Sequence, residues 1–140
     1  MDLAVALEFV AAHRRGVLVT LRGDGRPQLS NIFYLTGSDG SVRVSVTDDR
    51  AKTVNLRRDP RAQLYVTRED FFAYVVLDGT ASLSPVAEEV DDPVVDELVE
   101  MYRLASGEHP DWDEFRRAMV ADGRLVLTLS AAQAYGMLGS

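Results

Sequence analysis

The stretch SVRVSVTDDRAKTVNLRRDPRAQL, residues 41–64, contains the pattern that decides how the rest of the chain is arranged. From Val42 to Thr47, valine alternates with polar residues, which predicts a strand with one apolar face. The alternation ends at Asp48, and residues 50–56 are predicted to form a short helix with the Asp49 carboxylate as its N-cap. This strand and helix are the elements from which we interpret the remaining chain.

The first turn of this predicted helix has the chemistry of a phosphate-binding site. Arg50, Lys52 and Thr53 lie in or beside it, so two cations and a hydroxyl meet the free N–H groups of the helix. Residues 50–61 contain five of the 15 Lys and Arg residues of a chain whose formal net charge is -7. A local positive field on an acidic protein favours a small anionic ligand over nucleic acid. A solvated helix surface is the alternative interpretation, because charge runs are common on such surfaces.

The composition is that of one globular domain. The chain has 140 residues, of which 46% are hydrophobic and 26% are charged, and this length is sufficient for an ordinary core. No run of 18 apolar residues predicts a membrane span, and the N-terminal segment lacks the charge order of a signal peptide. There is no cysteine, and His13 and His109 are too far apart in sequence to suggest a metal site. A cytoplasmic location is therefore expected.

The order of predicted elements indicates a mainly β domain that forms a closed or half-open barrel. Helices are predicted at residues 2–13, 50–56, 93–104 and 112–121, and strands at residues 16–21, 26–35, 42–47, 61–67, 71–83 and 124–129. Gly79 is expected to form a bulge within the long strand, and Asp111 is expected to cap the last helix. The repeated βαβ pattern and the GxGxxG motif of a Rossmann fold do not occur.

An unusual group of amide and hydroxyl side chains lies on the predicted strand 26–35. Gln28 and Ser30 share one face of this strand, and Asn31 follows them. Two interpretations remain open: satisfied polar groups on the solvent side of a barrel, or hydrogen-bonding groups for a heterocycle that lies across the strand. The sequence has no GxSxG, HExxH or P-loop motif, so an enzyme built on this chain needs a cofactor to carry its chemistry.

The strings DGRPQLSN, RAKTVNLRRDPRA, GTASL and GEHPDWDEFRRAM, with the closing LTL–AYG segment, resemble one family over nearly the whole chain. It is the flavin/deazaflavin oxidoreductase family with the split β-barrel fold, which is related to pyridoxamine-phosphate oxidases. The resemblance is strongest to its actinobacterial branch, which binds the deazaflavin coenzyme F-420. This resemblance implies a single split-barrel domain over residues 1–140 and a homodimer with two cofactor sites at the subunit interface.

The resemblance also implies roles for individual residues. The cofactor phosphate would be held by Arg50, Lys52 and Thr53, and the acidic tail of a deazaflavin would face Arg57 and Arg58. The flavin-like ring would lie against residues of two strands, namely Gln28, Leu29, Ser30, Asn31, Ser45, Val46 and Thr47. From the partner subunit, the site would be reached by Phe72 and Tyr74.

The C-terminus differs from that of pyridoxamine-phosphate oxidases, in which an arginine-containing segment holds the substrate phosphate. No cation follows Arg124, so an enone, a tetrapyrrole or a quinone is a better expectation than a pyridoxal-type substrate. The expected function is hydride transfer between F-420 and a small organic molecule, with no catalytic side chain identified. The alternatives are an FMN-dependent oxidoreductase, a non-catalytic flavin- or deazaflavin-binding protein and a structural β-barrel module.

Overall fold

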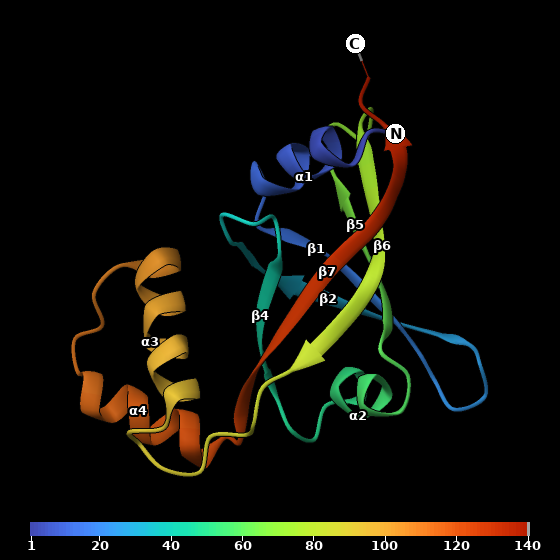
Figure 1. Ribbon diagram of the computed structural model, residues 1–140. Helices are drawn as coiled ribbons and strands as arrows, with labels where there is room; N and C mark the ends of the chain where they lie inside the picture. The colour runs from blue at the N-terminus through green and yellow to red at the C-terminus, as the bar shows by residue number, and fades with distance from the viewer. Residues whose placement is uncertain (140) are drawn as a thin grey trace.

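The computed structural model describes residues 1–139 and contains a seven-stranded antiparallel sheet that curls into a half-barrel, with four helices around it (Figure 1). The strands are β1 (Arg15–Leu21), β2 (Pro27–Phe33), β3 (Leu35–Thr36), β4 (Val42–Thr47), β5 (Arg61–Thr67), β6 (Tyr74–Leu83) and β7 (Arg124–Met137). The helices are α1 (Leu3–Ala11), α2 (Ala51–Arg58), α3 (Pro93–Ser106) and α4 (Trp112–Ala121). The spatial order of the strands is β2-β1-β5-β6-β7-β4-β3, which confirms the predicted half-open barrel.

The core fills the concave side of this sheet. Leu18, Leu64 and Leu77 lie in register across β1, β5 and β6, and all three are buried. Helix α1 covers one end of the half-barrel and α2 covers the other (Figure 1). A second apolar cluster lies outside the half-barrel, where α3 and α4 pack against Leu35 of β3 and Val126 of β7. None of the helices in the described residues is long and apolar enough to cross a membrane.

The sheet is split between β2 and β4, although the chain passes from one to the other through a short segment. Strand β3 has two residues and pairs with β4 only at Arg43 and Val42. Residues 45–47 of β4 therefore have β7 on one edge and, within residues 1–139, no strand on the other. Unpaired strand edges present N–H and C=O groups that can bind another molecule.

Three predicted strands have bounds that differ by more than one residue. The predicted strand 26–35 is divided at Tyr34 into β2 and β3, which lie at opposite ends of the strand order. The long strand begins at Tyr74 and not at Phe71, because residues 68–73 form a turn in which the Asp70 carboxylate accepts from the Phe72 N–H at 3.0 Å. Strand β7 continues to Met137 instead of ending at Leu129, because it pairs with β6 from Leu127 to Met137. The predicted bulge is confirmed by the register shift between Asp78 and Gly79.

The N-cap predicted for α2 was wrong, whereas that of α4 is confirmed. Helix α2 begins after Arg50, which makes no side-chain capping bond, and the Asp49 carboxylate accepts instead from the Thr47 hydroxyl at 2.8 Å. By contrast, Asp111 caps α4 by accepting from the Glu114 N–H at 3.1 Å. The first-turn N–H groups of α2 are therefore not capped by a side chain, which leaves them available to a ligand.

Candidate functional site

Three cations gather where β4 leads into α2. Arg50 and Lys52 come from this connection, and Arg124 lies opposite Thr47 in the ladder between β4 and β7. Burial lowers the pKa of Lys52 below its usual value, and the positive charges of Arg50 and Arg124 lower it further. We call these three residues the cation cluster. The lowering of the Lys52 pKa by Arg50 and Arg124 indicates a positive field that an anion would neutralise.

Arg124 is only weakly neutralised by the protein. Its Nε atom is buried and has no hydrogen-bond partner within residues 1–139. The carboxylate paired with it is that of Asp122, whose Oδ2 lies 3.8 Å from this Nε, beyond hydrogen-bond distance. A buried donor without a partner costs free energy, and a bound phosphate oxygen would supply the missing acceptor. The chemistry of the cluster therefore fits the phosphate of a flavin or deazaflavin.

Thr53 lies beside the cluster, but its hydroxyl is already engaged. The side chain is fully buried, and its Oγ1 donates to the Thr47 carbonyl at 2.7 Å. This bond joins the end of β4 to the first turn of α2. The structure therefore places Thr53 as a residue that fixes the geometry of the turn.

Arg57 and Arg58 both contact neighbouring loops. The Arg57 guanidinium forms an ion pair with Asp48, which closes the connection between β4 and α2. The Arg58 Nη2 donates to the Leu21 carbonyl at 2.8 Å and to the Asn55 Oδ1 at 2.9 Å. These bonds give both arginines a structural role on the surface of α2.

The four residues predicted on β2 fall on two faces of the sheet. Gln28 and Ser30 are half-buried on the concave face, and they lie opposite two buried residues of β1, Thr20 and Leu18. Neither side chain is hydrogen-bonded to another group within residues 1–139, and each is partly exposed, so both interpretations, solvation and contact with a heterocycle, stay open. The exposed side chains of Leu29 and Asn31 lie on the convex face.

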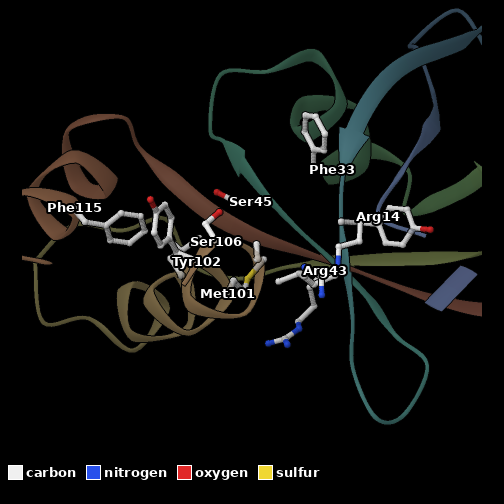
Figure 2. Close-up of a pocket in the computed structure, with 12 residues that line it drawn as sticks. Arg14, Phe33, Arg43, Ser45, Met101, Tyr102, Ser106 and Phe115 are labelled. Carbon is white, nitrogen blue, oxygen red and sulfur yellow. The ribbon is translucent and has the colours of Figure 1, made fainter. Parts of the chain in front are cut away.

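The predicted residues of β4 also alternate. Val46 is 1% exposed and points into the core, and its backbone groups face β7, because alternate residues of an antiparallel strand bond to the same neighbour. Ser45 and Thr47 lie on the opposite face, the face that α3 and α4 partly cover. Thr47 is next to the cation cluster, and Ser45 lines a pocket of about 420 Å³ between β4 and the two helices (Figure 2). The cluster and this pocket therefore lie along one face of β4.

Strand β6, whose first residue is Tyr74, begins at the other end of the half-barrel from α2 (Figure 1), and Phe72 lies in the turn before it. Phe72 is 74% exposed in the turn before β6, and the Tyr74 ring packs against Tyr65 with 5.7 Å between the ring centroids. The structure does not bring these two residues to the cation cluster of the same chain. Any role of theirs at a cofactor site requires a second subunit.

Arg124 and the pocket residues other than Ser45 were not predicted as site residues. Arg124 follows the turn at the end of α4, and nothing near it in sequence signals that it lies opposite Thr47. Met101 and Tyr102 lie on the apolar face of α3, which sequence alone interprets as packing against a core. Among residues 1–139, no group of three or more His, Cys, Asp or Glu side chains is arranged to hold a metal ion.

The comparison with known proteins supports one fold family. Of the solved structures, a conserved hypothetical protein from Mycobacterium tuberculosis is 25% identical, covers 99% of this chain and 85% of its own length, and superimposes with a TM-score of 0.74. An F-420 reductase is 21% identical over 87% of this chain and 89% of its own, with a TM-score of 0.67. The heme storage protein HutZ from Vibrio cholerae is 16% identical over 99% and 98%, with a TM-score of 0.70.

The likenesses at 21% and 16% identity show a shared fold and carry no further conclusion. The family model described as pyridoxamine 5'-phosphate oxidase matches residues 4–137, nearly the whole chain. The resemblance of the sequence to flavin and deazaflavin proteins of this type is confirmed by that match. The chain therefore belongs to the pyridoxamine 5'-phosphate oxidase family.

Proposed function

We propose that this protein binds coenzyme F-420 with the cofactor phosphate at the cation cluster, and that it transfers a hydride between the deazaflavin and an organic substrate. The cluster is the observation that carries this proposal. Arg50, Lys52 and Arg124 converge beside the uncapped first turn of α2 on a chain of net charge -7, and a buried Nε of Arg124 has no partner within residues 1–139. Phosphate is the common anion that helix N–H groups and arginines bind together.

In this proposal the ring lies in the split between β2 and β4. Gln28 and Ser30 offer side-chain donors and acceptors there, and the free edge of β4 offers backbone groups. The bound deazaflavin ring supplies or accepts the hydride, while the protein binds the phosphate, orients the ring and excludes water. Thr53 contributes by fixing the turn that positions Arg50 and Lys52.

FMN is the second candidate cofactor. It shares the ring and phosphate arrangement of F-420 but lacks the acidic tail. The residues expected to face that tail, Arg57 and Arg58, already contact Asp48 and the Leu21 carbonyl, and this observation favours FMN. The proposal for F-420 therefore does not rest on these two arginines. A protein that binds either cofactor without turnover is the remaining alternative, because no catalytic acid or base is identified from the sequence.

The cofactor affinity should fall as the pH rises toward 10.5, the ordinary pKa of a lysine, and this dependence tests the proposal. The pKa of Lys52 lies below that value because of burial and the nearby cations, so the ammonium loses its proton at a lower pH than an ordinary lysine does. A neutral amine cannot form a charge-assisted bond to phosphate. Fluorescence titrations with F-420 at several pH values should show the decline in wild type, and Lys52→Arg should remove most of it.

The sign of the stability change provides an independent control for the same residue. Because the pKa of Lys52 is lowered in the folded state, the unfolded chain binds more protons as the pH approaches 10.5. The free energy of unfolding of the ligand-free protein should therefore increase with pH there, opposite to the cofactor affinity. An affinity for F-420 in wild type that does not change as the pH rises to 10.5 would remove Lys52 from the phosphate site.

We also propose that the protein forms a homodimer through the convex face of the sheet. Val17, Tyr65, Val76 and Tyr135 lie in one row across β1, β5, β6 and β7 on this face. Several large apolar side chains are exposed at and around this row, including Leu29 at 60%, Phe33 at 78%, Tyr135 at 52% and Met137 at 62%. Apolar patches of this kind are typical of subunit interfaces.

Replacing Tyr135 with glutamate should halve the mass of the particle in solution, because a charge in the apolar row is costly to bury. Light scattering coupled to size exclusion measures this mass at micromolar concentration. Val90→Glu is the matched control, since Val90 is an exposed apolar residue before α3 and should leave the dimer intact. A wild-type protein with the mass of one chain would contradict the homodimer and the proposed role of Phe72 and Tyr74.

A further inference from the structure

The pocket beside Ser45 has the size and walls of a small-molecule site. Its volume is about 420 Å³, within the range of roughly 300–1,000 Å³ that is typical of ligand pockets. Tyr102, Met101 and Phe115 form the side contributed by α3 and α4, and Phe33 lies on the opposite side (Figure 2). Aromatic and thioether side chains on two sides favour a flat, apolar molecule.

The charged residues of the pocket are of one sign. Arg14 and Arg43 line it, and none of its other lining residues is acidic, although the chain as a whole carries an excess of Asp and Glu. The Arg43 Nε is buried and has no hydrogen-bond partner within residues 1–139. Its Nη1 lies 3.6 Å from the Glu97 Oε1, which is an ion pair but not a hydrogen bond. The Arg43 guanidinium therefore has donors available for a second anion.

The pocket and the proposed phosphate site lie along the same face of β4. Arg43, Ser45 and Thr47 are alternate residues of β4 and lie on one face, and Thr47 is opposite Arg124 of the cation cluster. A cofactor held by its phosphate at the cluster, with its ring beside Ser45, would have its ring next to the pocket. The pocket is then the place for a molecule that exchanges a hydride with that ring.

We propose that this pocket binds the substrate, and that the substrate is a flat, conjugated organic molecule with a carboxylate or similar anionic group held by Arg43. The role of the pocket as a substrate site rests on the proposed function, whereas its ability to bind an aromatic anion does not. The aromatic side chains hold the conjugated part, and the guanidinium selects the anion. A neutral molecule of the same shape would make the same aromatic contacts and would lack only the interaction with Arg43.

Two fluorescent probes with the same aromatic skeleton test this inference without any cofactor. 1-Anilinonaphthalene-8-sulfonate carries an anionic sulfonate, and N-phenyl-1-naphthylamine is its neutral counterpart. Arg43→Gln should weaken binding of the anionic probe about 10-fold, as expected for the loss of one charge-assisted bond, and should leave the neutral probe nearly unchanged. Arg43→Lys should restore part of the loss. Arg26→Gln, at an exposed arginine of the β1–β2 hairpin, is the matched control and should change neither affinity.

A second variant identifies the pocket as the site of binding. Ser106 lines the pocket at the end of α3, so Ser106→Trp should fill it and weaken both probes at least about 10-fold. Unchanged binding of the anionic probe in both Arg43→Gln and Ser106→Trp would overturn the inference. Complete displacement of the probe by saturating F-420 would also overturn it, because the pocket would then hold the cofactor ring. Simultaneous binding of the probe and F-420 would support a separate substrate site.

Discussion

Replacing both Arg50 and Lys52 with alanine should weaken binding of F-420 by about two to four orders of magnitude. Charge-assisted hydrogen bonds to a phosphate are worth roughly 1.5–3 kcal/mol each, and two of them would be lost. The fold should persist, since cations at a helix N-terminus oppose the helix dipole and these two also repel each other. Fluorescence titration gives the affinity, and circular dichroism checks the fold.

A double substitution of exposed arginines elsewhere is the control for this loss of charge. Arg26 and Arg117 lie outside the cation cluster, and their replacement with alanine removes the same net charge. The affinity of that control variant should stay within about threefold of wild type, because exposed charges at a distance are screened by salt. Arg124→Gln should weaken F-420 binding about 10-fold or more, as expected for the loss of one phosphate contact. Wild-type affinity in a folded Arg50→Ala/Lys52→Ala variant would refute the phosphate assignment.

The largest effect on stability is expected for Gly79→Ala. A Cβ atom at this position would lie 2.0 Å from the Ser130 carbonyl oxygen and 2.8 Å from its carbon, both of which are backbone atoms of β7. A backbone clash cannot be relieved by a change of rotamer, so the bulge between β6 and β7 must move. We expect the free energy of unfolding to fall by about 3 kcal/mol, measured by urea denaturation.

Gly23→Ala is the matched control for this prediction. A Cβ atom at Gly23 would meet nothing closer than the Arg58 Cζ at 3.7 Å, which is ordinary van der Waals contact with a long side chain. Its free energy of unfolding should therefore stay within about 0.5 kcal/mol of wild type. Equal denaturation midpoints for the Gly79 and Gly23 variants would show that the bulge can accept a side chain.

The local pattern of the sequence predicts several elements well. The alternation of apolar and polar residues identifies β4 and β5 with their observed bounds, because each of these strands has one buried face. Asp111 and the residues that follow it predict α4 because the capping bond is local. The two cations beside the first turn of α2 are also predicted from sequence, since Arg50 and Lys52 are close together in the chain.

The elements that sequence misses depend on distant partners or on competing local bonds. Residues beyond Leu129 form a strand because β6 lies beside them, and Arg124 joins the cation cluster because β7 pairs with β4. At Phe71 and Phe72, aromatic residues favour a strand, but the bond from the Phe72 N–H to Asp70 produces a turn. The pocket combines β4 with α3 and α4, which are separated by long stretches of chain.

The most direct test of the proposed function is a titration of the purified protein with F-420 and, separately, with FMN, followed by absorbance and fluorescence. We expect F-420 to bind saturably with one molecule per chain, and this binding to be weakened in the Arg50→Ala/Lys52→Ala variant. Saturable binding of FMN with none of F-420 would assign the site to the flavin. No saturable binding of either cofactor by the folded protein would contradict the proposal that the cation cluster is a cofactor phosphate site.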